Sequence, residues 1–334
     1  MREEIRVTMN NLEKDLKKVR TELGINEHLL YEAFKKKMVE EYKARTSQEL
    51  MINSVIKNNG TYESFVLKMD EAGISPNIYI QPLFEMYINR FYKEMEEKSL
   101  KEVDKLEAMS FETAYKQLTN IIESTQNQTP QMDLEFKLEN LVLQVIGSEN
   151  NKVIMEESPF RVIEGTNLIC IYKWVIGENK NGVCSARITN KDIARYGLDK
   201  FSDDELYELA LKNTQRLFPG VVRDMMEMLD MPFPDEIPEE DRMWVVTNEK
   251  GINGATSILY KGILEEVFEK IGGNFYIIPS SIHEIICISA KNRDAEPLKT
   301  LVGEVNGGLV ENHERLSYNV YLYEVETDSI RIAA

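Results

Sequence analysis

The chain has 334 residues, enough for about two or three domains with buried cores. Forty Lys and Arg residues stand against 57 Asp and Glu residues, which gives a formal net charge of −17 at pH 7. This balance disfavours direct binding to nucleic-acid phosphates or to an anionic membrane surface. A hydrophobic content of 43% and a charged content of 29% lie near globular averages, which argues against a disordered, collagen-like or disulfide-stapled chain.

The sequence predicts a cytoplasmic protein without a membrane span. Its longest stretches free of Asp, Glu, Lys and Arg are 13 residues, at 72–84 and 271–283, whereas a spanning helix needs roughly 18. The N-terminus mixes acidic and basic residues without the apolar core of a secretory signal. Three separated cysteines, with no CxxC pair, are expected to be reduced thiols at Cys170, Cys184 and Cys287.

Helical periodicity extends from residue 2 to about 47, interrupted at Gly24, and predicts a helical N-terminal segment over 1–48. Two β-leaning runs between residues 50 and 69 flank Asn58-Asn59-Gly60, where Asn and Gly tolerate positive φ, so a hairpin is expected. An extended piece over 77–80 and helices over about 82–108 and 111–123 follow. The polar segment 124–131 predicts a loop that ends a second region, 49–130.

The rest of the chain, 131–334, mixes strands and helices. Strands are predicted over 160–176 and 183–188 with a turn at 179–182, followed by a helix over 191–196. A helix over 203–217 has Ser202 as its N-cap and Glu205 three residues later, which is a capping box. The later predicted elements are an acidic, proline-rich loop (231–241), strands at 243–247, 274–278, 282–289 and 318–323, and helices at 260–271 and 295–304.

These patterns predict an α+β protein, with a helical N-terminal segment followed by mixed α/β layers that contain antiparallel or mixed sheets. No Walker loop, GxGxxG, HExxH, GxSxG or zinc-ligand spacing occurs. The three histidines, His28, His283 and His313, are scattered along the chain. We therefore predict neither a metal site nor a cofactor.

The candidate catalytic residues lie in the string Pro279-Ser280-Ser281-Ile282-His283-Glu284. His283 can serve as general acid or base, with Ser280, Ser281 or Glu284 assisting. A strand over 282–289 would place Ser281 and His283 on one face and Glu284 on the other, so the three groups would not converge locally. The alternative is structural: the hydroxyls satisfy a turn and the imidazole is hydrogen-bonded at a sheet edge.

A second candidate segment follows the strand at 243–247. Thr247, Asn248 and Asn253 are candidate ligand-binding residues in a loop that also holds Gly251 and Gly254. Small residues allow close backbone approach, as in a ligand cradle. Because the Lys and Ser/Thr spacing of a phosphate loop is missing, simple turn chemistry is the competing interpretation.

Several strings give the chain a family resemblance. They include Lys57-Asn58-Asn59-Gly60, Thr247-Asn248 with Asn253-Gly254-Ala255, Leu259-Tyr260, and Phe275 through Glu284. On these residues the chain resembles an uncharacterised family of bacterial proteins, a domain of unknown function, over roughly residues 50–325. Lys261 stands where that family's pattern has Pro, and Asn319 where it has His. The resemblance implies a cytoplasmic α+β protein and no particular chemistry.

Two function hypotheses of different classes follow. The first is an acidic protein-interaction or regulatory protein that binds a basic partner protein, with an inhibitor that mimics nucleic-acid charge as one version. It draws on the 13 acidic and 5 basic residues of segment 201–250. The second is an enzyme of unrecognised type with its site around His283, which requires the loops near Asn248 and His283 to meet.

Overall fold

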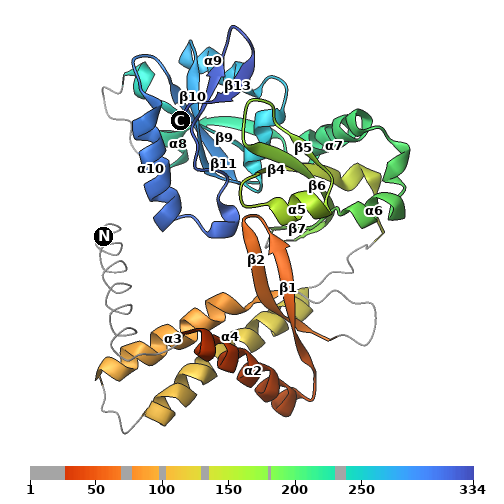
Figure 1. Ribbon diagram of the computed structural model, residues 1–334, viewed down its shortest axis with the longest axis vertical. Helices are drawn as coiled ribbons and strands as arrows, with labels where there is room; N and C mark the ends of the chain where they lie inside the picture. The colour runs from red at the N-terminus through yellow and green to blue at the C-terminus, as the bar shows by residue number, and fades with distance from the viewer. Residues whose placement is uncertain (1–26, 69–76, 98–102, 129–134, 180–181, 230–237) are drawn as a thin grey trace. The chain divides into compact units, whose positions relative to one another are not determined.

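The computed structural model describes residues 27–68, 77–97, 103–128, 135–179, 182–229 and 238–334 (Figure 1). The predicted helix before Gly24 and most of the acidic loop 231–241 lie outside these ranges. Contacts divide the chain into two compact units. Unit 1 comprises residues 1–55 and 61–130, and unit 2 comprises residues 56–60 and 131–334. The boundaries expected after residues 48 and 130 remain predictions.

Unit 1 packs three helices against a small antiparallel sheet. Phe34 lies at the centre of its core, with its ring centroid 5.5 Å from Phe84, 5.1 Å from Tyr87 and 6.1 Å from Phe111. These aromatic contacts join three helices, because one ring comes from the first helix, two from the second and one from the third. The elements are α2 (Glu27–Thr46), β1 (Leu50–Lys57), β2 (Gly60–Leu67), β3 (Ile78–Tyr79), α3 (Ile80–Glu97) and α4 (Val103–Gln128).

Two helix boundaries in unit 1 differ from the prediction. The break expected near residue 109 is wrong, because α4 runs through it with Ser110 fully buried. The loop expected from residue 124 is wrong over its first part, since α4 continues to Gln128. Polar uncharged residues do not by themselves end a helix, and the first strong helix breaker here is Pro130.

The predicted hairpin is confirmed at β1 and β2. Asn59 adopts the left-handed conformation, with φ of 62°, which an asparagine accommodates more readily than most residues. By its contacts the end of this hairpin, residues 56–60, belongs to unit 2.

Unit 2 contains two antiparallel sheets. In the four-stranded sheet the long strand β6 pairs with β4 on one side and with β5 and β7 on the other. The six-stranded sheet has the order β13-β12-β10-β11-β9-β8. A large core of apolar side chains from both sheets, including Leu141, Val145, Phe275 and Tyr321, lies in unit 2. A smaller apolar cluster joins α10 to the six-stranded sheet through Val302 and Ile278.

The strands of unit 2 are β4 (Leu141–Gly147), β5 (Phe160–Val162), β6 (Leu168–Asn179), β7 (Gly182–Arg187), β8 (Gly220–Asp224), β9 (Met243–Asn248), β10 (Phe275–Ser281), β11 (Glu284–Ser289), β12 (Tyr321–Glu324) and β13 (Ser329–Ile332). Its α-helices are α5 (Lys152–Glu157), α6 (Asn190–Arg195), α7 (Asp203–Leu217), α8 (Met225–Met228), α9 (Ile263–Ile271) and α10 (Ala295–Gly308). Its 3-10 turns are η2 (Leu138–Asn140), η3 (Leu198–Lys200), η4 (Glu239–Asp241), η5 (Gly254–Leu259) and η6 (Asn312–Glu314).

Strand β4 is buried along its whole length although it lies at the edge of its sheet. Its outward backbone groups are satisfied by side chains. The N–H of Leu143 donates to Thr214 Oγ1 at 2.9 Å, and the N–H of Val145 donates to Thr256 Oγ1 at 3.1 Å. These bonds attach α7 and η5 to the strand, because a buried N–H must find an acceptor.

The α+β prediction is confirmed. Ser202 and Glu205 form the predicted capping box at the start of α7. Strands β4, β8 and β13 were not expected from the sequence, whereas the helix predicted over 260–271 is present as α9, which begins at Ile263. The strand predicted from residue 282 begins at Glu284, so His283 lies in the turn between β10 and β11.

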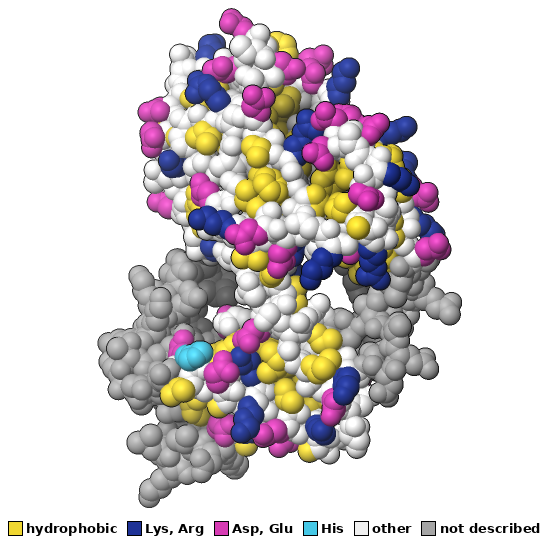
Figure 2. Space-filling model, turned by 45° about the vertical axis from the view of Figure 1, so that its right-hand side comes forward, with side chains coloured by type: hydrophobic (Ala, Val, Ile, Leu, Met, Phe, Trp, Pro, Cys, Tyr) yellow, Lys and Arg dark blue, Asp and Glu magenta, His cyan; other side chains and the backbone are white. Residues whose placement is uncertain are grey.

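On the face shown in Figure 2, acidic and basic side chains lie interspersed with hydrophobic ones. Within the described ranges, no helix combines the length and the apolar composition needed to cross a bilayer.

Thr256→Val tests the β4 edge. The change keeps the side-chain shape and leaves the buried Val145 N–H without its acceptor, so we expect a loss of about 1–3 kcal/mol in the free energy of unfolding of unit 2. Urea unfolding followed by tryptophan fluorescence measures this, because both tryptophans, Trp174 and Trp244, belong to unit 2. Thr300→Val on the exposed face of α10 is the control. Equal stability of the two variants would contradict the role given to Thr256.

Candidate functional site

The turn between β10 and β11 holds His283 against the loop that follows β9. The backbone N–H of Asn253 donates to His283 Nδ1 at 3.1 Å, and His283 Nε2 lies 3.5 Å from Glu314 Oε1. An accepting Nδ1 assigns the proton of the neutral ring to Nε2, on the side of the carboxylate. The His283 side chain keeps 32% of its surface exposed, so its Nε2–H can reach a ligand.

Close packing fixes this turn against the loop. Thr247 Oγ1 donates to the carbonyl of His283 at 2.8 Å. A Cβ at Gly254 would lie 2.2 Å from Thr247 Oγ1 and 2.4 Å from the His283 carbonyl oxygen. Only glycine fits at position 254, and the approach that it permits brings the two segments together.

The other predicted site residues make local contacts. Ser280 Oγ donates to Glu284 Oε1 at 3.3 Å, and Ser281 Oγ accepts from the backbone N–H of His283 at 3.0 Å. Asn248 supports its own loop, accepting from Lys250 N–H and donating to the Ile252 carbonyl. Within the described residues, none of these four side chains is hydrogen-bonded to the imidazole. The structure therefore joins His283 to the Asn253 segment and to Glu314, a partner 31 positions away that no local motif could indicate.

A second ionisable group, Lys173 on β6, lies in a narrow pocket that Ser185 and Asn253 also line. Burial and the nearby charge of Lys57 lower the pKa of Lys173 to about 8. Among the residues that the structure describes, none makes an ion pair or a hydrogen bond with its amine. The lowered pKa therefore reflects a partly buried cation without an acidic neighbour.

Lys57, at the end of β1, lies close enough to affect the charge of both Lys173 and His313. Its charge contributes to lowering the pKa of both Lys173 and His313, burial being the larger cause in each case. His283 also lowers the pKa of His313. Lys57, Lys173, His283 and His313 thus form one group of basic side chains in unit 2, which we call the basic cluster. Glu314 and Glu311 are carboxylates that act on this cluster, and Glu314 Oε1 lies 3.5 Å from His283 Nε2.

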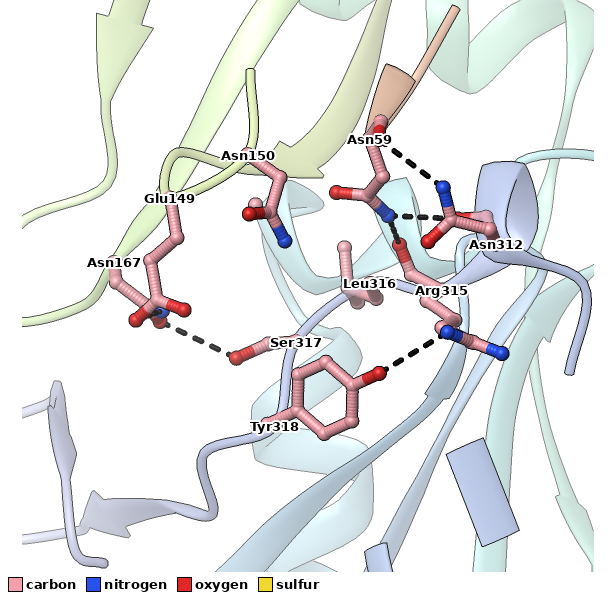
Figure 3. Close-up of a pocket in the computed structure, with 10 residues that line it drawn as sticks. Asn59, Glu149, Asn150, Asn167, Asn312, Arg315, Leu316, Ser317 and Tyr318 are labelled. Carbon is pink, nitrogen blue, oxygen red and sulfur yellow. Dashed lines mark hydrogen bonds between the residues drawn. The ribbon is translucent and has the colours of Figure 1, made fainter. Parts of the chain in front are cut away.

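Asparagines hold the hairpin end that carries Lys57. Asn58 Nδ2 donates to the carbonyls of His313 at 3.1 Å and Arg315 at 2.7 Å. Figure 3 shows Asn59 beside η6, where its Nδ2 donates to the carbonyls of Asn312 and Arg315, and Asn312 Nδ2 donates back to the Asn59 carbonyl. The pocket drawn there leaves about 20 Å³ for the centres of water molecules, which is enough for one or two waters. The hydrogen bonds around it position the hairpin end, and the pocket itself is too small for a larger ligand.

The cysteines and the described acidic residues indicate neither a thiol nucleophile nor a metal site. Burial raises the pKa of all three thiols, that of Cys170 to about 12, so none is a ready nucleophile. Among the described residues, no group of three or more His, Cys, Asp and Glu side chains is arranged to hold a metal ion.

A model of a family of unknown function, DUF5688, matches residues 31–325. The chain belongs to this family. The resemblance expected from the sequence is confirmed, and the DUF5688 match includes both the hairpin and the His283 turn. Searches of the curated proteins and of the solved structures found no match.

Lys173→Met tests the buried cation of this DUF5688 protein. The folded-state pKa of about 8 lies below the ordinary 10.5, so the unfolded state binds more protons between these values and stability rises with pH in that window. Below pH 8 the Lys173 amine is charged in the folded protein, and burying this charge lowers the free energy of unfolding by at most about 3 kcal/mol. We expect the variant to be the more stable protein at pH 7, with the difference shrinking towards pH 10.

Urea unfolding at several pH values measures this difference. Lys299→Met, at an exposed position on α10, controls for the loss of one positive charge. A stability difference between native protein and Lys173→Met that stays constant from pH 7 to pH 10 would contradict the interpretation.

Proposed function

We propose that unit 2 binds a small molecule through a carboxylate or phosphate group at the basic cluster, and that His283 exchanges a proton with that molecule. The observation that carries the proposal is Lys173, a partly buried cation that has no acidic partner among the described residues. Burying a charge is unfavourable unless an opposite charge accompanies it. An anionic ligand would supply that charge.

Neutral donors beside Lys173 support the same ligand class. The Ser185 hydroxyl and the Asn253 side-chain NH₂ line the pocket with Lys173, and neither donates a hydrogen bond to another described residue. Asn253 is oriented by Gln144, whose Nε2 donates to Asn253 Oδ1 at 2.9 Å. Ammonium, hydroxyl and amide donors together suit the oxygens of an anion.

The dimensions of the pocket limit what enters it. About 10 Å³ is open to the centre of a water molecule, which is room for about one water, so a ligand would place a single oxygen of its anionic group in the pocket and keep the rest outside. The rest of such a ligand would extend towards the solvent-exposed edge of His283. The Nε2 of that ring lies 3.5 Å from Glu314 Oε1, and a ring positioned beside a carboxylate is suited to exchange a proton with a ligand.

Inorganic phosphate is the probe for this function. We expect phosphate to raise the unfolding temperature of the native protein at constant ionic strength, as ligand binding to the folded state requires. Lys173→Met should bind phosphate about tenfold or more weakly, which corresponds to at least ~1.4 kcal/mol, whereas Lys299→Met should bind like the native protein. Equal phosphate binding by the two variants would contradict the site.

The second candidate is an acidic interaction protein with a basic protein partner. It is supported by the net charge of −17 and by exposed acids of segment 201–250, such as Asp203 and Glu208. Other acids of that segment already have partners, since Asp241 pairs with Arg293 and Glu240 with Lys291. A partner would therefore be recognised locally rather than by a uniformly negative surface.

Affinity capture from native lysate at low and high salt tests the second candidate. We expect a stoichiometric basic protein that is retained at low salt and lost at high salt, because exposed charges are screened. His283→Ala should retain it, since the anion site is separate. Absent or salt-insensitive binding would contradict this function.

We also propose the cytoplasm as the compartment of this protein. Cys170, Cys184 and Cys287 are all unpaired, which fits a reducing environment.

A further inference from the structure

A groove on unit 2 takes no part in the basic cluster. It is lined by residues of α5, β5, α6, η3 and the start of α7. Its volume of about 820 Å³ is within the range of sites that hold sizeable ligands.

The walls of the groove combine apolar and acidic side chains. Phe160 on β5 lines the groove and is 38% exposed. The other apolar side chains of the lining include Met155, Ile193, Leu198 and Phe201. Apolar side chains that gather at a concave surface around an exposed ring indicate a binding site more than scattered ones do.

Three carboxylates, Asp199, Asp203 and Asp204, line the same groove. Asp204 pairs with Arg161 at 2.7 Å, and the guanidinium of Arg161 also lies over the ring of Tyr207. Asp199 and Asp203 make no ion pair with a described residue and are exposed. The groove thus presents two uncompensated negative charges beside apolar walls.

We propose that this groove binds a short segment of a partner protein in which Lys or Arg residues alternate with apolar residues. The apolar side chains would cover Phe160 and its neighbours, and the cations would pair with Asp199 and Asp203. This inference rests on the second candidate function and supplies its binding surface.

A fluorescein-labelled octapeptide of alternating Lys and Leu is the probe, with alternating Glu and Leu as the control peptide. Fluorescence anisotropy with the full chain should show saturable 1:1 binding of the Lys peptide only. Asp199→Asn with Asp203→Asn should weaken binding about tenfold, and Phe160→Ser should weaken it as well. The matched control, Glu269→Gln with Glu304→Gln on exposed positions of α9 and α10, removes the same charge and should bind as the native protein does.

The possible outcomes distinguish the groove proposal from the proposal that the protein binds a basic partner. Equal weakening by both double variants, or no binding of the Lys peptide to the native protein, would overturn the groove proposal. A basic partner captured from lysate with the same yield by native protein and by the Asp199 and Asp203 double variant would leave the interaction function standing and remove the groove from it. Circular dichroism of each variant confirms that it is folded.

Discussion

The buried edge of β4 is the constraint on which unit 2 depends. A strand at a sheet edge ordinarily exposes its free N–H and C=O groups to water, but every residue of β4 is buried. The N–H groups of Leu143 and Val145 therefore bond to Thr214 and Thr256, and the Leu141 carbonyl accepts from Asn213 Nδ2 at 3.1 Å. Because unpaired buried backbone groups are costly, α7 and η5 have to sit where these side chains reach β4.

The position of the candidate site follows from this arrangement. η5, which carries Thr256, begins at Gly254, directly after Asn253. The same short segment thus bonds to β4 through Thr256 and through Gln144, and to the His283 turn through the Asn253 N–H. Contacts that stabilise the core also set the orientation of the imidazole. A loss of packing at β4 would therefore also change the orientation of the His283 ring.

The local charge of the site is opposite to the charge of the whole molecule. The chain carries −17, yet Lys57, Lys173, His283 and His313 gather beside Glu314 and Glu311. Composition therefore says little about what this region binds, since an anion at Lys173 experiences its near neighbours more strongly than distant, screened acids. The acidic surface and the basic cluster can serve different ligands.

The sequence by itself determined the features that depend on neighbours along the chain: the α+β class, the hairpin at Asn58-Asn59-Gly60, and the Ser202–Glu205 capping box. The sequence also identified His283 and the Asn253 loop as candidate site residues, because an imidazole and a glycine-rich turn are recognisable without a structure. Only the tertiary structure decided that Lys57, Lys173 and Glu314 join them, and that Glu284 and the two serines do not bond to the ring. The reason is physical: local patterns record capping and turn preferences between adjacent residues, whereas a charge cluster is assembled from strands and turns separated by tens to hundreds of positions, which come together only when the core packs.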